Sequence, residues 1–123
     1  MPTYKTSPYK TPLQTYLFRG TAVDNAGVAN ITGGVSRVYC ISVHNGDGAV
    51  RYVSLLDSRA VGASNQSILF PVDANEDMTV FIDVGVMFGT AVTLTSSTNP
   101  DGTTGAPTAV NVNVMSAEAT SGA

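Results

Sequence analysis

Few residues in this chain are of the types that usually carry out chemistry. The sequence contains a single histidine, His44, and a single cysteine, Cys40. A hydrolytic triad requires a nucleophile, a base and an acid held together, and no nucleophile elbow or second histidine accompanies His44. Zinc sites require clusters of cysteine or histidine, and the sequence has none. The sequence therefore predicts that the protein is not an enzyme, and we expect His44 to lie at a strand end beside a turn.

Acidic loops are the remaining candidates for ligand binding. The segment 73–77 reads Asp-Ala-Asn-Glu-Asp and could offer oxygen atoms to calcium, and Asp47 lies in a second acidic turn. Neither has the ligand spacing and flanking helices of an EF-hand. We interpret both as solvated turns. No glycine-rich loop between a strand and a helix is available to hold a phosphate, so we expect no metal and no cofactor.

Cys40 and the N-terminal residues indicate the cellular compartment in which the protein is made. A lone cysteine inside an apolar run cannot form a disulfide within the chain, which argues against a disulfide-framed secreted domain. We expect Cys40 to be a small buried hydrophobic residue. No apolar stretch approaches the ~20 residues of a membrane helix, and residues 1–12 lack the apolar segment of a secretory signal. We expect a soluble protein that is made in a cytoplasm.

The composition predicts an all-β domain. Valine and threonine dominate, whereas lysine, glutamate and glutamine occur only twice each. β-Branched residues pack well on a pleated surface and lose rotamer freedom in a helix. Charged residues make up 12% of the chain, about half of the usual ~25%. Both lysines lie in residues 1–12 and all nine acids lie beyond them, so a basic arm precedes an acidic body without the clustered basic face of a nucleic-acid-binding protein.

Alternating residues predict seven strands, with an eighth conceivable. The expected strands span residues 13–23, 35–45, 49–57, 67–72, 78–83, 86–95 and 109–115. The turn Asn-Gly-Asp-Gly at 45–48 is typical of a hairpin, so we expect strand 49–57 to return antiparallel to strand 35–45. Both faces of strand 35–45 carry apolar groups, so the pattern does not determine which face points into the core. Pro71 indicates an edge strand, and Val110, Val112 and Val114 are expected to point inward.

This spacing predicts a single antiparallel two-sheet β-sandwich, of either jelly-roll or immunoglobulin-like topology. The sandwich is expected over residues 13–115, between an extended arm at 1–12 and a flexible tail at 116–123. In the arm, three prolines favour an extended chain, and Tyr-Lys occurs twice at an interval of five residues. We expect the arm to contact a neighbouring subunit. The candidate binding residues are Tyr4, Lys5, Tyr9, Lys10, Tyr16 and Arg19.

Residues 35–115 resemble a family of small virion proteins from tailed bacteriophages. The resemblance rests on residues 38–45 followed by 51–57, and on 70–75 followed by 85–95. In that family, a strand ending in Asn precedes a strand containing Arg-Tyr. A Gly-x-x-Phe step later leads to a Gly and an apolar strand ending in Thr. The arm has no counterpart in this resemblance.

The resemblance implies a decoration, or cement, protein on the capsid surface of the virion, made in the host cytoplasm. Such proteins commonly form trimers that bind the major capsid protein and stabilise its lattice. The implied partners are the major capsid protein and further copies of this chain as a homotrimer, with no nucleic acid and no membrane. The alternative is a head-fibre base, a head-tail connector or a tail component. In that role the loops at 58–66 and 96–107 would act as a recognition or glycan-binding module.

Overall fold

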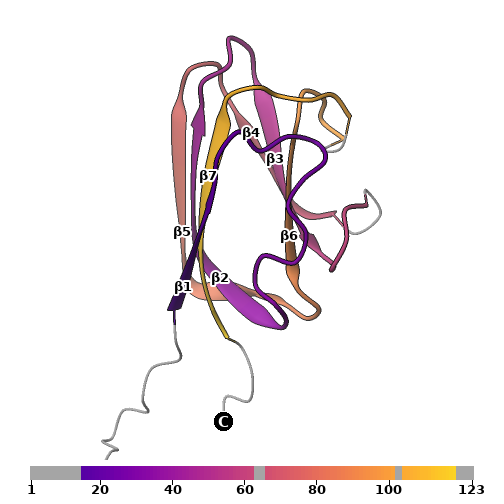
Figure 1. Cartoon of the computed structure of the whole chain (residues 1–123). Coiled ribbons are helices and arrows are strands. Elements are labelled where there is room, and N and C mark those ends of the chain that lie inside the picture. The colour runs from indigo at the N-terminus through magenta and orange to yellow at the C-terminus, as the bar shows by residue number, and fades with distance from the viewer. Residues whose placement is uncertain (1–14, 63–65, 102–103, 119–123) are drawn as a thin grey trace, which may run out of the picture.

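A computed structural model describes residues 15–62, 66–101 and 104–118, and in this part of the chain it is all-β without a helix. Seven strands form two antiparallel sheets that face each other (Figure 1). The first sheet has the order β1-β7-β2-β5 and the second has the order β4-β3-β6. The strands are β1 (Thr15–Gly20), β2 (Ser36–Asn45), β3 (Arg51–Asp57), β4 (Gln66–Val72), β5 (Asp77–Phe88), β6 (Val92–Ser97) and β7 (Val110–Glu118). The predicted two-sheet sandwich is therefore confirmed.

The core lies between the sheets and is made of aliphatic side chains with one phenylalanine. On β7, Val110, Val112 and Val114 are buried and the asparagines between them are exposed, as the alternation predicts. Full burial of one such side chain stabilises the fold by about 1.5–3 kcal/mol. The fully buried core residues of the other strands include Val38, Ile41, Val53, Leu55, Phe88, Val92 and Leu94.

The strand order distinguishes between the two topologies that the sequence leaves open. In an immunoglobulin-like sandwich the last strand belongs to the sheet opposite the first, whereas here β7 lies between β1 and β2. In a jelly roll the first and last strands are neighbours, and the second strand crosses to the other sheet beside the penultimate strand. The connection between β1 and β2 follows that path, because Val28 forms an antiparallel bridge with Leu94 of β6. The topology is that of a jelly roll with one strand reduced to a bridge.

The expectation that strands 35–45 and 49–57 form a hairpin is wrong. Strand β2 pairs with β5 and β7, whereas β3 pairs with β4 and β6 in the other sheet. A two-residue hairpin turn of type I′ needs positive φ at both central positions, and neither Gly46 nor Gly48 has positive φ. Instead, the N–H of Gly46 donates to the carbonyl of Ala109 at 2.8 Å. The turn residues bind other loops, and the chain crosses between the sheets.

A β-bulge explains why both faces of β2 carry apolar residues. The register with β7 shifts between Val38 and Cys40, so that Tyr39 is an extra residue in the strand. An extra residue reverses the inward and outward phase of all residues beyond it. Val38 therefore faces the core before the bulge, and Ile41 and Val43 face it afterwards. The strand has one buried face throughout, although no single alternation describes it.

Three strand boundaries differ from expectation. Strand β5 is continuous from Asp77 to Phe88, where two strands separated at residues 84–85 were expected, and the break lies at residues 89–91. Gly85 adopts a φ of 76°, and the register with β2 jumps from Phe81 to Val86. Strand β1, described from Thr15, ends at Gly20, three residues before the expected end at Val23. Strand β7 continues to Glu118, so the sandwich includes three residues that the sequence analysis assigns to the tail.

The edges of the second sheet differ in how they are protected. Strand β4 is an edge and carries Pro71, as expected. Strand β6 is the opposite edge, yet all six of its residues are buried. The β1–β2 connection covers this edge, and Figure 1 shows it running across to β6. Its backbone pairs with β6 through Val28 and Leu94, and the N–H of Ile31 donates to the carbonyl of Val92. Covering an edge in this way prevents its pairing with another chain.

Candidate interaction surface

Four apolar side chains form a row across the outer face of the four-stranded sheet. Leu17 of β1 lies opposite Met115 of β7, Met115 lies opposite Cys40 of β2, and Cys40 lies opposite Phe81 of β5. Their neighbours in each strand, such as Phe18 and Ile41, point into the core instead. We call Leu17, Met115, Cys40 and Phe81 the apolar row. It spans the whole width of the sheet.

The apolar row is open to solvent. Phe81 is 76% exposed, Leu17 50% and Met115 40%. Cys40 is half-buried on this outer face, and the expectation that it is a buried core residue is wrong. Val84 and Met87 of β5 are also exposed. Among the described residues, six of the eight exposed large hydrophobic side chains lie in strands of this sheet, namely Tyr16, Leu17, Phe81, Val84, Met87 and Met115.

Polar rows follow the apolar row along the same face. Ser42 of β2 lies opposite Asn113 and Thr79, and the Thr79 hydroxyl lies 3.4 Å from that of Ser42. In the next row, His44 Nδ1 lies 2.5 Å from a carboxylate oxygen of Asp77. Both partners of this pair are largely exposed, so water weakens their interaction. Within the described part of the chain, the side chain of His44 is hydrogen-bonded to this acid and to no hydroxyl that could act as a nucleophile.

The outer face of the second sheet is different, because loops cover it where β3 and β6 lie side by side. Ser54, Leu56, Thr93 and Thr95 are fully buried there. The Thr93 hydroxyl donates to the carbonyl of Ser58 at 2.7 Å and accepts from the N–H of Asn30 at 2.9 Å. The described part of the loop at 58–62 therefore packs against the sandwich. Of the two sheet faces, the one with the apolar row is open.

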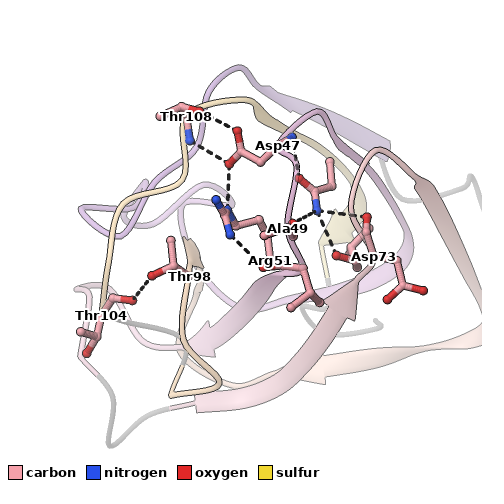
Figure 2. A network of polar contacts seen from close by, with 10 residues as sticks. Asp47, Ala49, Arg51, Asp73, Thr98, Thr104 and Thr108 are labelled. Carbon is pink, nitrogen blue, oxygen red and sulfur yellow. Dashed lines mark hydrogen bonds and ion pairs between the residues drawn. The ribbon is translucent and has the colours of Figure 1, made fainter.

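A buried carboxylate joins the loops at one end of the sandwich (Figure 2). The side chain of Asp47 is only 5% exposed and accepts from Arg51 Nε at 2.8 Å. It also accepts from the hydroxyl of Thr108 at 2.5 Å and from the N–H of Thr108 at 3.0 Å. The Thr108 hydroxyl has the largest effect, followed by the Thr108 N–H and then Arg51, and together they outweigh burial and lower the pKa of Asp47 from 3.8 to about 2. Asp47 is thus a buried, paired acid, and its expectation as a solvated turn residue is wrong.

Asn45 extends this network to the turn between β4 and β5. Its amide nitrogen lies 2.9–3.1 Å from the carbonyl oxygens of Ala49, Val72 and Asp73, and its amide oxygen accepts from the N–H of Asp47. Together with the contact between Asp47 and Thr108, the network in Figure 2 joins the three connections that follow β2, β4 and β6. Both groups have their partners within the protein. The network holds loops together and leaves no unpaired group for a ligand.

The candidate binding residues from the sequence fall into two groups. Tyr4, Lys5, Tyr9 and Lys10 lie outside the described residues. Tyr16 and Arg19 lie in β1, three residues apart and therefore on opposite faces of the sheet. Arg19 is exposed on the outer face, opposite Asn113, one row from Leu17. The structure therefore brings Arg19, and not Tyr16, to the face of the apolar row.

The sequence analysis did not find the apolar row. Its four members come from four strands that are distant in the sequence, so their meeting depends on strand pairing. A local signal exists, however, because Phe81 follows Val80, Met115 follows Val114, and Leu17 precedes Phe18. Apolar residues at consecutive positions of a strand place one of them on each face. Such pairs in three strands of one sheet indicate an outer face with apolar character.

Comparisons with family models, with curated proteins and with solved structures found no match for this chain. Within the described ranges, no group of three or more His, Cys, Asp or Glu side chains could hold a metal ion. The same part of the chain has no helix of the length and apolar character needed to cross a membrane. The inference of function therefore depends on the surface of the sandwich and on the sequence.

Proposed function

We propose that this protein is a non-enzymatic structural component of a bacteriophage virion. In this role it binds the outer surface of the capsid as a decoration, or cement, protein and stabilises the lattice of the major capsid protein. It acts as a homotrimer. The resemblance of residues 35–115 to small virion proteins of tailed bacteriophages supports the phage setting, and the surface of the sandwich supports a role in assembly.

The apolar row is the observation that carries the role in assembly. Monomeric proteins rarely expose large contiguous apolar patches, and those that do commonly use them to bind other proteins. Here an apolar row lies on the one open sheet face, flanked by short uncharged side chains such as Ser42, Thr79 and Asn113. Interface cores are depleted in charge and rich in aromatic residues and methionine. Phe81 and Met115 fit that composition.

Binding to an assembled lattice gives a physical route to stabilisation. A ligand that binds the assembled state and not the free subunit shifts the equilibrium towards assembly, by about 2.7 kcal/mol per site at a free concentration of 100 Kd. Linking several copies in one trimer adds avidity without new contacts for each copy. A small sandwich without chemistry of its own can therefore stabilise a capsid.

The copy number of this chain in purified virions tests the proposal. Quantitative mass spectrometry would compare the chain with the major capsid protein in the same particles. We expect a ratio near one copy per capsid subunit, or one copy per few subunits. A handful of copies per particle would overturn lattice decoration and would assign the chain to a head-fibre base, a connector or the tail.

Deletion of residues 2–11 tests whether the arm contributes to capsid binding. We expect the truncated protein to fold, because it retains all seven strands and the core cluster between the sheets. We also expect it to bind capsids that lack the native protein more weakly than the full chain does. Cosedimentation with such capsids measures the binding, and circular dichroism checks the fold. Binding that is undiminished in the truncated protein would remove the arm from the interface.

A further inference from the structure

We infer that the apolar row of one copy is the docking surface for the N-terminal arm, residues 1–12, of a second copy. The inference deepens the self-association in the proposed function but does not depend on a capsid. The arm of a second copy is the proposed occupant of the open sheet face. Three observations carry it, namely the dimensions of the apolar row, the charges beside it and the distance between the row and the start of β1.

The arm is long enough to cross the apolar row. From Leu17 to Phe81 the apolar row crosses three strand spacings, which is about 14 Å at ~4.8 Å each. Tyr4 and Tyr9 are five residues apart, which is about 16 Å in an extended chain at ~3.3 Å per residue. An odd spacing places the two rings on opposite faces of an extended chain, so one tyrosine ring of an arm can lie on the apolar row while the arm crosses the full width of the row. Tyrosine is well suited to such a site, because its ring contributes a large apolar area and its hydroxyl can stay in water.

The charges beside the apolar row complement those of the arm. Lys5 and Lys10 are the only lysines of the chain, and each follows a tyrosine directly. The edge at β5, where the apolar row ends with Phe81, carries exposed Asp83 and also Asp77, which is paired with His44, whereas Arg19 lies near the opposite end of the row. The segment 71–88 contains four acids and neither lysine nor arginine. Complementary charges of this kind guide association and fix the register of the partners.

The position of β1 favours a second copy over the chain's own arm. The apolar row begins at Leu17, only two residues beyond the first residue of β1. To cover the row, a chain's own arm would have to reverse direction directly before Thr15. The arm of a second copy needs no such reversal to lie across the row. An arm that binds a different surface on the next copy makes a heterologous contact, which forms a ring such as the proposed trimer when the rotation between copies closes.

Cys40 offers a direct measurement, because it is the only thiol in the chain and lies inside the apolar row. The purified full-length protein and the protein lacking residues 2–11 would react with N-ethylmaleimide, and mass spectrometry would follow the labelling. At a concentration of free chain about tenfold above the dissociation constant, we expect the full chain to react about tenfold more slowly. We expect this protection to disappear on dilution together with the oligomer, which analytical ultracentrifugation would follow.

Single substitutions make the test specific. Tyr9→Ala in the arm and Phe81→Ser in the apolar row are both expected to speed labelling of Cys40 and to weaken self-association. Val35→Ser is the matched control, since Val35 is also exposed but lies outside the apolar row, and it should leave the labelling rate unchanged. Phe81 is 76% exposed, so its replacement should leave the fold intact.

Two outcomes would overturn the inference. Equal labelling rates with and without residues 2–11 would show that the arm does not cover the apolar row. Protection that persists in a monomer at every dilution would assign the row to the chain's own arm instead of a second copy. Neither outcome changes the copy number expected in virions, so failure here is distinct from failure of the proposed function.

Discussion

Asp47 fixes the connection between β2 and β3 through hydrogen bonds, where the sequence predicts a hairpin turn. Its carboxylate accepts three hydrogen bonds, one from Arg51 at the start of β3 and two from Thr108 in the connection between β6 and β7, as Figure 2 shows. Burial of an unpaired carboxylate is costly, whereas a paired and hydrogen-bonded one is tolerated. The local sequence Asn-Gly-Asp-Gly is thus used to cross between the sheets.

Replacing Asp47 by alanine should destabilise the fold by about 2–4 kcal/mol, because it leaves Arg51 and Thr108 without their acceptor in a buried site. Urea unfolding followed by circular dichroism measures the free energy of unfolding. Asp77→Ala is the matched control. It removes the acid of the exposed pair with His44 and should cost no more than about 1 kcal/mol. Equal losses in the two variants would contradict the assigned importance of the buried network.

The pKa of Asp47 predicts a specific acid sensitivity. In the folded protein it is about 2, below the ordinary value of 3.8, so the unfolded state binds the proton more readily. The stabilising contribution of Asp47 is therefore complete above about pH 3.8 and is lost as the pH falls towards 2. The difference in urea midpoint between the native protein and Asp47→Asn should shrink across this window. A difference that stays constant from pH 5 to pH 2 would contradict the lowered pKa.

Among the elements, β2 and β5 together show how an irregularity can shape a surface. The bulge at Tyr39 of β2 lies beside the part of β5 where the register jumps from Phe81 to Val86. A side-chain nitrogen of Arg37 donates to the carbonyl of Val84 at 3.3 Å. Gly85 fits there because a β-carbon at its position would come within 2.9 Å of the Tyr39 ring. Bulges are common at sheet edges, where they redirect side chains, and here one lies beside the exposed Val84 and Phe81.

Gly85→Ala should destabilise the fold by about 2 kcal/mol or more, because alanine at positive φ is strained and its β-carbon would displace Tyr39. Gly33→Ala is a matched control with the same backbone strain. Gly33 has a φ of 75°, and no atom lies within 4 Å of a β-carbon placed there. We expect it to cost about 1 kcal/mol. Thermal unfolding of both variants measures the difference, and a smaller loss for Gly85→Ala would contradict close packing at the bulge.

At the scale of the whole molecule, the two sheets present different surfaces. Loops bury the outer face of β3 and β6, and the β1–β2 connection covers the edge of β6. The outer face of the other sheet is open and carries the apolar row. A sandwich with one open apolar face is suited to association on that face, which is the basis for proposing self-association.

The proposed trimer predicts a particle of about three times the chain mass of 12.7 kDa. Analytical ultracentrifugation of the full-length protein over a range of concentrations measures it. Phe81→Ser should shift the distribution towards the monomer, because Phe81 is the one aromatic residue and the most exposed side chain of the apolar row. A protein that remains monomeric at all concentrations would restrict trimer formation to the capsid surface.

Local pattern was enough to predict several features of this protein. The all-β class, the number of strands and the inward face of β7 follow from β-branched residues and period-two alternation, which act within a few residues. The edge position of β4 follows from Pro71, since proline cannot donate a hydrogen bond to a neighbouring strand. These features need no knowledge of which strands pair.

The topology, the register and the apolar row depended on which strands pair. The turn at 45–48 has the sequence of a hairpin, but its polar groups find better partners in Thr108, Asp73 and Ala109, which are distant in the sequence. The bulge at Tyr39 reverses a phase that alternation alone cannot follow. The apolar row exists only because four remote strands align Leu17, Met115, Cys40 and Phe81. Hydrogen bonds between strands are non-local, so register and topology, and with them the candidate surface, emerged only in the tertiary structure.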